Sequence, residues 1–175
     1  VLYGTTAATT ASARMGLILK YAGVEDIRLL NGGKTLWTLE GRELDTEKHE
    51  PEHVEFGAEV PVNPEVIYDY DEELEVVNNE NAVVASIRSW PEYTGEVSGY
   101  TYIGEAGDIA NARFGYAGSD PYGMEDFRNV DNTMFNYEMI ADRWELWGIT
   151  PDKEVSFHCG TGWRASETYF YAYAL

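Results

Sequence analysis

The chain has 175 residues, of which 44% are hydrophobic and 14% aromatic, enough to bury the core of one domain or parts of two. Its formal net charge is −19, so its bulk surface should repel nucleic acid and anionic membranes. No run of about 18 apolar residues is present, so we expect no membrane span. The single cysteine, Cys159, cannot form an internal disulfide, and a lone cysteine is more often a small buried hydrophobe than a catalyst.

Residues 1–41 are predicted to form a strand, a helix, a second strand and a short helix. Val1-Leu2-Tyr3 is a short apolar run typical of the end of a strand, so we expect the chain to begin inside a fold; the sequence points to no compartment, cytoplasmic or exported. Apolar residues at helical spacing predict a helix over 11–22. Residues 27–30 indicate a buried strand, and 34–40 a short helix.

Residues 42–63 are charged, contain prolines and lack periodicity, which favours an interdomain linker. His49 and His53 lie four residues apart among glutamates, a spacing that could hold a metal ion. No third ligand follows at a suitable spacing. We therefore interpret the segment as a solvated linker and expect no metal.

Residues 64–175 again alternate helical and strand patterns, interrupted by a long segment rich in Gly, Tyr, Asp and Asn. Segments of that length in a compact domain commonly lie near a functional site. An acidic run, which lacks the glycine and glutamate spacing of a calcium loop, is interpreted as the face of a short helix. The predicted elements are the acidic helix 69–75, strand 82–87, loops 90–134, helix 137–148, strand 155–158 and a helix from 165 to the end.

This alternation predicts an α/β fold with a largely parallel central sheet flanked by helices. In such sheets ligands bind beyond the carboxyl ends of the strands. Cys159 directly follows one predicted strand and Arg88 follows another. Both residues are therefore expected at the edge of the sheet where a site would form.

Two segments of the chain resemble each other and suggest tandem copies of one domain. Val1-Leu2-Tyr3 matches Val155-Ser156-Phe157, and Ala11-Ser12 matches Ala165-Ser166 at the start of a helix. In this comparison Thr5 stands where the later copy has Cys159, so the first copy would lack the thiol.

The loop Cys159-Gly160-Thr161-Gly162-Trp163-Arg164 joins a predicted strand to a predicted helix. Two glycines allow successive backbone N–H groups to point inward, and such a nest at a helix N-terminus binds anions. The same field favours the thiolate over the thiol, which makes the cysteine a nucleophile. We expect Arg164 to add a fixed charge suited to sulfonate oxygens.

Cysteine-dependent phosphatases also place a Cys loop before a helix, with five residues between Cys and Arg. Here only four residues separate Cys159 from Arg164, and the next position is Ala165. A loop that is one residue short is too tight for a phosphoryl group and better suited to a single sulfur atom. A phosphatase is therefore the least favoured of the alternatives.

The sequence resembles rhodanese-like sulfurtransferases, in particular the bacterial tandem-domain thiosulfate sulfurtransferases. The resemblance extends over nearly the whole chain, and its most specific part is the Cys loop. The supporting segments are Ile87-Arg88-Ser89 with Glu92-Tyr93 and Gly95, Gly107-Asp108-Ile109-Ala110-Asn111-Ala112, and Leu30-Asn31-Gly32-Gly33 with Trp37. Ser86 and Asp108 depart from the family pattern, which has Asp and His there, so we expect the Asp-x-Arg brace of the loop to be weaker.

The resemblance implies a double displacement through a persulfide on Cys159, with thiosulfate as the sulfur donor and cyanide or a thiol as the acceptor. Arg164 stands where mercaptopyruvate-specific members have Thr, which favours thiosulfate. No cofactor is implied. Arg88 is either a substrate-binding group or a structural ion pair beneath the loop. The expected active-site loop beside Cys159 consists of Gly160, Thr161, Gly162, Trp163, Arg164 and Ala165.

The resemblance also predicts the domain organisation. Residues 1–41 would be the closing part of a preceding, catalytically silent rhodanese-like domain, 42–63 a linker, and 64–175 the catalytic domain. Because Leu175 falls inside the helix after the loop, we expect the chain to be truncated within tandem repeats and to belong to a longer multi-domain protein. The alternative function is a rhodanese-like binding or regulatory module, or an inactive fragment, without useful turnover.

Overall fold

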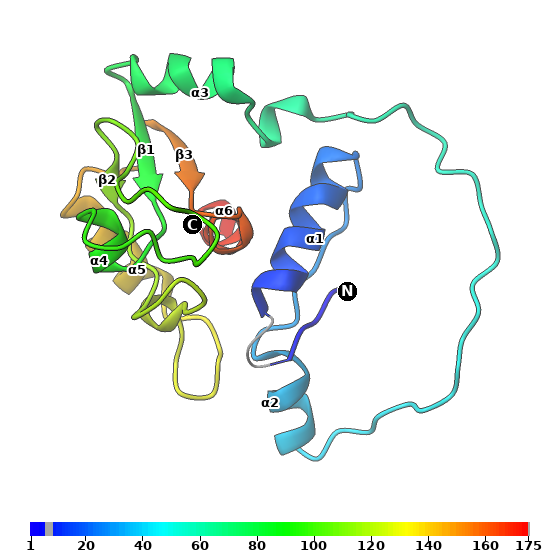
Figure 1. Ribbon diagram of the computed structural model, residues 1–175. Helices are drawn as coiled ribbons and strands as arrows, with labels where there is room; N and C mark the ends of the chain where they lie inside the picture. The colour runs from blue at the N-terminus through cyan, green and yellow to red at the C-terminus, as the bar shows by residue number, and fades with distance from the viewer. Residues whose placement is uncertain (6–8, 175) are drawn as a thin grey trace.

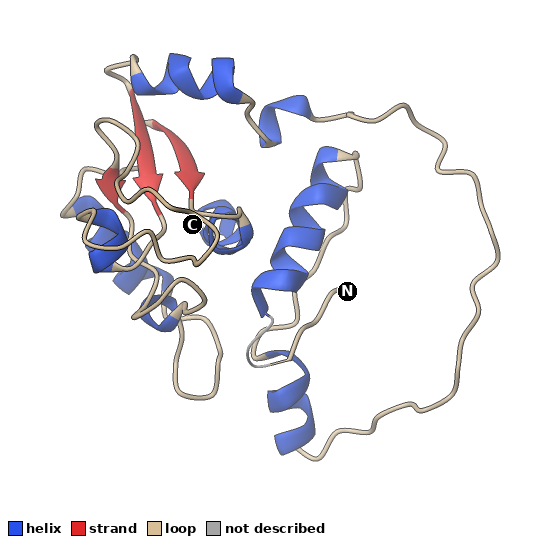
Figure 2. Ribbon diagram, viewed as in Figure 1, coloured by secondary structure: helices blue, strands red, loops and turns tan. Residues whose placement is uncertain are grey.

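A computed structural model describes residues 1–5 and 9–174, and its centre is a parallel three-stranded sheet (Figures 1 and 2). Strand β1 (Ala82–Ser86) lies between β2 (Arg113–Phe114) and β3 (Glu154–His158) and is parallel to both. Because β1 is central, most of its side chains are buried, as its continuous run of small and β-branched residues predicts. The expected α/β class with a mostly parallel sheet is confirmed.

Helices cover both faces of this sheet. On one face α5 (Tyr137–Glu145) packs Ile140 and Trp144 against the side chains of β1. On the other face α3 (Tyr70–Val77) packs Val76 against the same strand. The acidic run is the start of α3, where Asp69 and Glu72 form a capping box. Helix α3 is therefore capped by residues that could otherwise suggest a calcium loop.

We call the elements before residue 42 the amino-terminal unit. It contains α1 (Thr9–Tyr21), α2 (Gly33–Leu39) and a parallel bridge between Leu2 and Leu29. The two strands expected there are thus reduced to a single bridge, since in the described chain each has only the other as a neighbour. Side by side with α1 lies α6 (Trp163–Ala174), the helix that follows Cys159 (Figure 1).

The α1–α6 contact is close because Gly16 has no side chain. A Cβ atom at Gly16 would lie 2.9 Å from the ring of Phe170, closer than carbon atoms normally approach. The helix ends at Tyr21, and the carbonyl of Tyr21 accepts hydrogen bonds from the N–H groups of Val62 and Asn63. The end of the linker is thereby attached to the first unit.

Residues 42–63 contain no helix or strand, and nearly all of them are exposed. In Figure 1 this segment is the long cyan loop that leaves α2 and returns toward η1 (Pro64–Val66). His49 Nε2 lies 2.6 Å from Asp45 Oδ2, and both side chains are exposed. None of the helices within 1–5 and 9–174 is both long and apolar enough to cross a bilayer.

The long segment predicted as loops contains only short elements. These are α4 (Trp90–Tyr93), β2 and η2 (Glu125–Phe127). Tyr100 and Phe127 from this segment are nevertheless buried, so the segment packs over the carboxyl end of the sheet as well as connecting elements. Helix α6 begins two residues earlier than predicted, and the expected continuation to Leu175 lies outside the described residues.

Candidate active site around Cys159

Cys159 and Arg88 emerge at the same edge of the sheet, as their positions after two strands predict. Ser86 of β1 is the register partner of His158 of β3, and the N–H of Ile87 donates to the carbonyl of His158 over 2.8 Å. The chain then turns through residues 159–162 into α6. The site is therefore built where two parallel strands end and a helix begins.

The Cys159 sulfur lies inside the loop that follows it. The N–H of Gly162 donates to Cys159 Sγ over 3.1 Å, and the thiol is only partly buried. Gly162 has φ +78°, in the left-handed region that a glycine adopts without strain. Gly160 is needed for a different reason, since a Cβ atom there would lie 2.1 Å from the Tyr100 ring. The loop therefore requires glycine at both positions to adopt its curled conformation.

Arg164 has a different environment from the one that the sequence suggested. Its side chain is 2% exposed, and its two Nη atoms each donate to Glu92 over 2.9 Å. Nη2 also lies 3.2 Å from the Tyr100 hydroxyl. Its Nη donors are thus bonded inside the protein, whereas its buried Nε has no hydrogen-bond partner, and a role for Arg164 in orienting an anionic donor stays a prediction.

The Arg164–Glu92 pair keeps both groups charged. Burial alone would raise the pKa of Glu92, but hydrogen bonds from Arg164 and Ser89 hold that pKa below its ordinary value. Burial alone would lower the pKa of Arg164, and the Glu92 carboxylate raises it instead. A buried ion pair with this fixed geometry holds the first turn of α6 in a single position relative to α4.

Arg88 makes ionic contacts of the kind expected for a structural ion pair, which was one of its two predicted alternatives. It is 8% exposed, with Nε 3.5 Å from Glu92 Oε1 and Nη1 3.5 Å from Asp108 Oδ2. It also donates to the backbone carbonyls of Gly107 and Ser98. These contacts hold the loops beside the nucleophile, while the buried Arg88 Nε has no hydrogen-bond partner.

The departures from the family pattern at positions 86 and 108 compensate for each other. Asp108 Oδ2 accepts a hydrogen bond from Ser86 over 2.6 Å, while Asp108 Oδ1 lies 2.8 Å from His158 Nε2 as an ion-pair contact. Burial would raise the pKa of Asp108, but His158 and Ser86 hold it below its usual range. A carboxylate therefore still faces Arg88, although it comes from the loop and not from β1.

The outer side of the loop is more open and rich in aromatic rings. A cavity of about 350 Å³ is bordered by Trp163, Tyr102 and Tyr122, all substantially exposed, and by the buried Tyr100. The rings of Tyr100 and Tyr102 lie 5.3 Å apart, and those of Tyr100 and Tyr122 6.0 Å apart. An apolar acceptor or a cationic group could bind against such faces.

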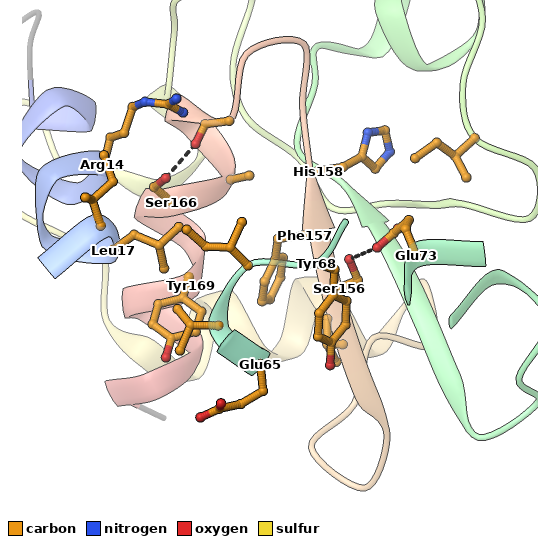
Figure 3. A pocket seen from close by; sticks show the side chains of 17 residues that line it. Arg14, Leu17, Glu65, Tyr68, Glu73, Ser156, Phe157, His158, Ser166 and Tyr169 are labelled. Atoms are coloured by element: carbon orange, nitrogen blue, oxygen red, sulfur yellow. Dashed lines mark hydrogen bonds between the residues drawn. The ribbon is translucent and has the colours of Figure 1, made fainter. Parts of the chain in front are cut away.

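A second cavity of about 380 Å³ lies between α1, α6 and β3 (Figure 3). Arg14 of α1 borders it, with its guanidinium directed to the start of α6, where Nη1 donates to the carbonyl of Thr161 over 2.8 Å. Deeper in the same cavity, Ser156 donates to Glu73 over 2.6 Å. A side chain from the amino-terminal unit therefore reaches the Cys159 loop.

From the sequence, Glu92 was identified only as part of a supporting motif, and Tyr100 and Arg14 were not identified. Glu92 had a local signal, since Ser89 and Glu92 form a capping box at α4, and Glu92 is part of the Glu-Tyr motif. Tyr100 and Arg14 had none. Their contacts with the loop join residues 60 or more positions apart and depend on how the chain packs.

The chain is 45% identical over its whole length to the thiosulfate sulfurtransferase YnjE of Escherichia coli. It is 32% identical over 86% of its length to the sulfur carrier protein TtuD of Thermus thermophilus. No protein-family model matches. Among solved structures, the anaerobic ergothioneine biosynthesis enzyme of Chlorobium limicola, in complex with trimethyl histidine, superposes with a TM-score of 0.93 at 43% identity over 98% of this chain.

A strand-end cysteine loop on a parallel α/β sheet is the arrangement of a rhodanese-like domain, and the relatives agree with the fold. The chain belongs to the rhodanese-like sulfurtransferase family. It spans 40% of YnjE, 53% of TtuD and 44% of the Chlorobium limicola enzyme.

Proposed function

We propose that the protein transfers sulfane sulfur through a persulfide on Cys159. The observation that carries the proposal is the hydrogen bond from the Gly162 N–H to Cys159 Sγ at a strand–helix junction. A donor already directed at the sulfur stabilises negative charge there without rearrangement, whether the species is a thiolate or a persulfide anion. In this proposal the other N–H groups of the loop, from Gly160 to Ala165, also stabilise the persulfide.

The reaction has two displacements. The Cys159 thiolate attacks the outer sulfur of thiosulfate, the sulfur–sulfur bond of thiosulfate breaks, and sulfite leaves with the bonding electron pair. A thiophilic acceptor, either cyanide or a cellular thiolate, then attacks the terminal sulfur of the persulfide. That step releases the Cys159 thiolate and yields thiocyanate or a new persulfide.

Thiosulfate is favoured as donor because the relative of highest identity given above, YnjE, bears the name thiosulfate sulfurtransferase. Arg164 supports the same donor through its charge, since its guanidinium donates hydrogen bonds to Glu92. Its positive charge lies close to Cys159, and in this proposal the charge attracts the anionic donor as well as stabilising the thiolate.

A second acceptor class has specific support. One solved form of EanB carries a cysteine persulfide together with ergothioneine, and it superposes on this chain with a TM-score of 0.93 at 42% identity. Quaternary ammonium groups bind well against aromatic faces, and the outer cavity beside Thr161 is bordered by Tyr102, Tyr122 and Trp163. A trimethylated histidine is therefore the alternative acceptor.

The test is an intact-mass measurement on the full-length protein that contains this chain. Incubation with thiosulfate should add about 32 daltons, one sulfur atom, and a Cys159→Ala variant should not gain it. The isolated persulfide is then offered cyanide, glutathione or trimethylated histidine in parallel. Absence of the adduct would favour the alternative reading as a binding module without turnover, and the acceptor that removes the adduct identifies the reaction.

We also propose the domain division stated above, with 1–41 as the end of a preceding domain, 42–63 as a linker and 64–175 as the catalytic domain. Its support is the exposed course of 42–63 and the separate Leu2–Leu29 bridge. Expression of 64–175 alone tests it, because a folded product with a cooperative unfolding transition is expected only if the boundary is placed correctly.

A further inference from the structure

The peptide unit between Thr161 and Gly162 is held from both ends. Its carbonyl oxygen accepts a hydrogen bond from Arg14 Nη1 over 2.8 Å, and its N–H donates to Cys159 Sγ over 3.1 Å. The peptide is trans, so its C=O and N–H point in opposite directions. Whatever fixes the carbonyl on the outside therefore also fixes the direction of the N–H that faces the sulfur.

We infer that Arg14, which belongs to the amino-terminal unit, is a positioning residue for the nucleophile, acting through the Thr161–Gly162 peptide. The inference rests on the proposed function, in which Cys159 is the reacting group. A guanidinium bonded to the carbonyl fixes the peptide plane and polarises it, which strengthens the bond from its N–H to an anionic sulfur. The catalytic loop is then complete only when the preceding unit is docked.

Arg14 differs from the other two arginines near the loop in the groups that it contacts. Arg88 and Arg164 are buried, and their Nη atoms contact Glu92, Asp108 and backbone carbonyls. Arg14 is partly exposed and, within residues 1–5 and 9–174, takes part in no ion pair with a carboxylate. Its guanidinium is therefore committed to the loop carbonyl and not to an acidic partner.

The fit is tight at this point. A Cβ atom at Gly162 would lie 2.7 Å from Arg14 Nη1, so the guanidinium lies directly against the glycine backbone. Arg14 is on the same helix as Gly16, whose missing side chain brings α1 close to α6. The approach of the two helices and the contact of the guanidinium with the loop are thus parts of one interface.

The reactivity of Cys159 is the readout, measured in the full-length protein with a neutral alkylating reagent, iodoacetamide, from about pH 6.5 to about pH 10.5, which is about two units on each side of the ordinary thiol midpoint of about 8.5. The other ionisable groups that interact with Cys159 are Arg164 and Tyr100, and neither is changed in these variants. Replacing Arg14 with Met removes the charge and the donor but keeps the length of the stem. We expect the midpoint of alkylation to move to higher pH by about half a unit, a roughly threefold loss of thiolate below the midpoint.

Two variants complete the comparison. Arg14→Lys keeps a charged donor and should recover most of the shift, whereas a purely structural contact would not distinguish Lys from Met. Arg28→Met removes the same charge from the same unit at an exposed site paired with Asp26, and should leave the midpoint unchanged. Cys159→Ala identifies any alkylation at other cysteines, which is subtracted.

The outcomes separate this inference from the proposed function. A midpoint in Arg14→Met equal to that in Arg28→Met overturns the role of Arg14, whatever thiosulfate does. A wild-type protein that alkylates as expected but forms no persulfide overturns sulfur transfer and leaves the positioning role intact. If Arg14→Met unfolds, Arg14→Gln, which is too short to reach the carbonyl and keeps a polar surface, gives the same decision.

Discussion

The inner and outer sides of the Cys159 loop are held by different kinds of contact. On the inner side Arg88, Glu92 and Arg164 form a buried ionic cluster with almost no exposed surface. On the outer side Arg14 of the other unit and the partly exposed Trp163 meet the loop near solvent. The inner contacts should therefore determine whether the loop keeps its shape, and the outer contacts should determine how the thiol reacts and what approaches it.

The largest expected effect is on the inner side. Glu92→Gln leaves the Arg164 guanidinium buried without a full charge partner, and breaking a buried pair in this way costs about 3 to 5 kcal/mol in the free energy of unfolding. Urea unfolding of both proteins measures the difference. Glu96→Gln, four residues later at an exposed position, is the matched control and should change stability by less than about 0.5 kcal/mol. Equal midpoints for the two variants would contradict a structural role for the pair.

Acid should weaken the same cluster. The pKa values of Glu92 and Asp108 are lowered by their hydrogen bonds and ionic partners. A carboxyl whose folded-state pKa is depressed adds stability that is fully present above its unfolded pKa, about 4, and is lost as pH falls through the folded value. The unfolding free energy should therefore decline between about pH 5 and pH 2. Glu92→Gln should show a shallower decline, and an identical slope would remove Glu92 from the explanation.

Positions 86 and 108 offer a test of compensation within the inner side. Ser86→Asp would bring a second carboxylate against Asp108, where the present Ser86–Asp108 hydrogen bond is 2.6 Å long, and like charges so close are destabilising. We expect a loss of about 2 kcal/mol for the single variant and a partial recovery in Ser86→Asp/Asp108→Asn. Additive losses in this double-mutant cycle, measured by urea unfolding, would mean that the two positions do not share one carboxylate site.

The difference between local patterns and long-range contacts explains which features could be predicted from the sequence. The alternation of strands and helices and the position of Cys159 after β3 follow from local patterns, so the parallel sheet and the loop were predicted correctly. The partner of Arg164 was not predictable, because Glu92 lies 72 residues away and only the fold brings the two side chains together. Arg14 lies 147 residues from Thr161, and its helical segment has no signal beyond its apolar spacing.

The smallest expected effects belong to the outer aromatic cavity. Tyr122 is 73% exposed, so Tyr122→Ala should alter the free energy of unfolding by less than about 0.5 kcal/mol. Its ring borders the cavity beside Thr161 and Trp163, and an acceptor that binds against it should need a roughly threefold higher concentration for half-maximal transfer in the variant. Formation of the persulfide from thiosulfate should be unchanged, because the donor reacts at Cys159 before the acceptor binds. Tyr137→Ala, another exposed tyrosine at the start of α5, is the matched control. If both variants transfer sulfur with equal acceptor dependence, the cavity does not bind the acceptor, and the outer side acts on the reaction through Arg14 alone.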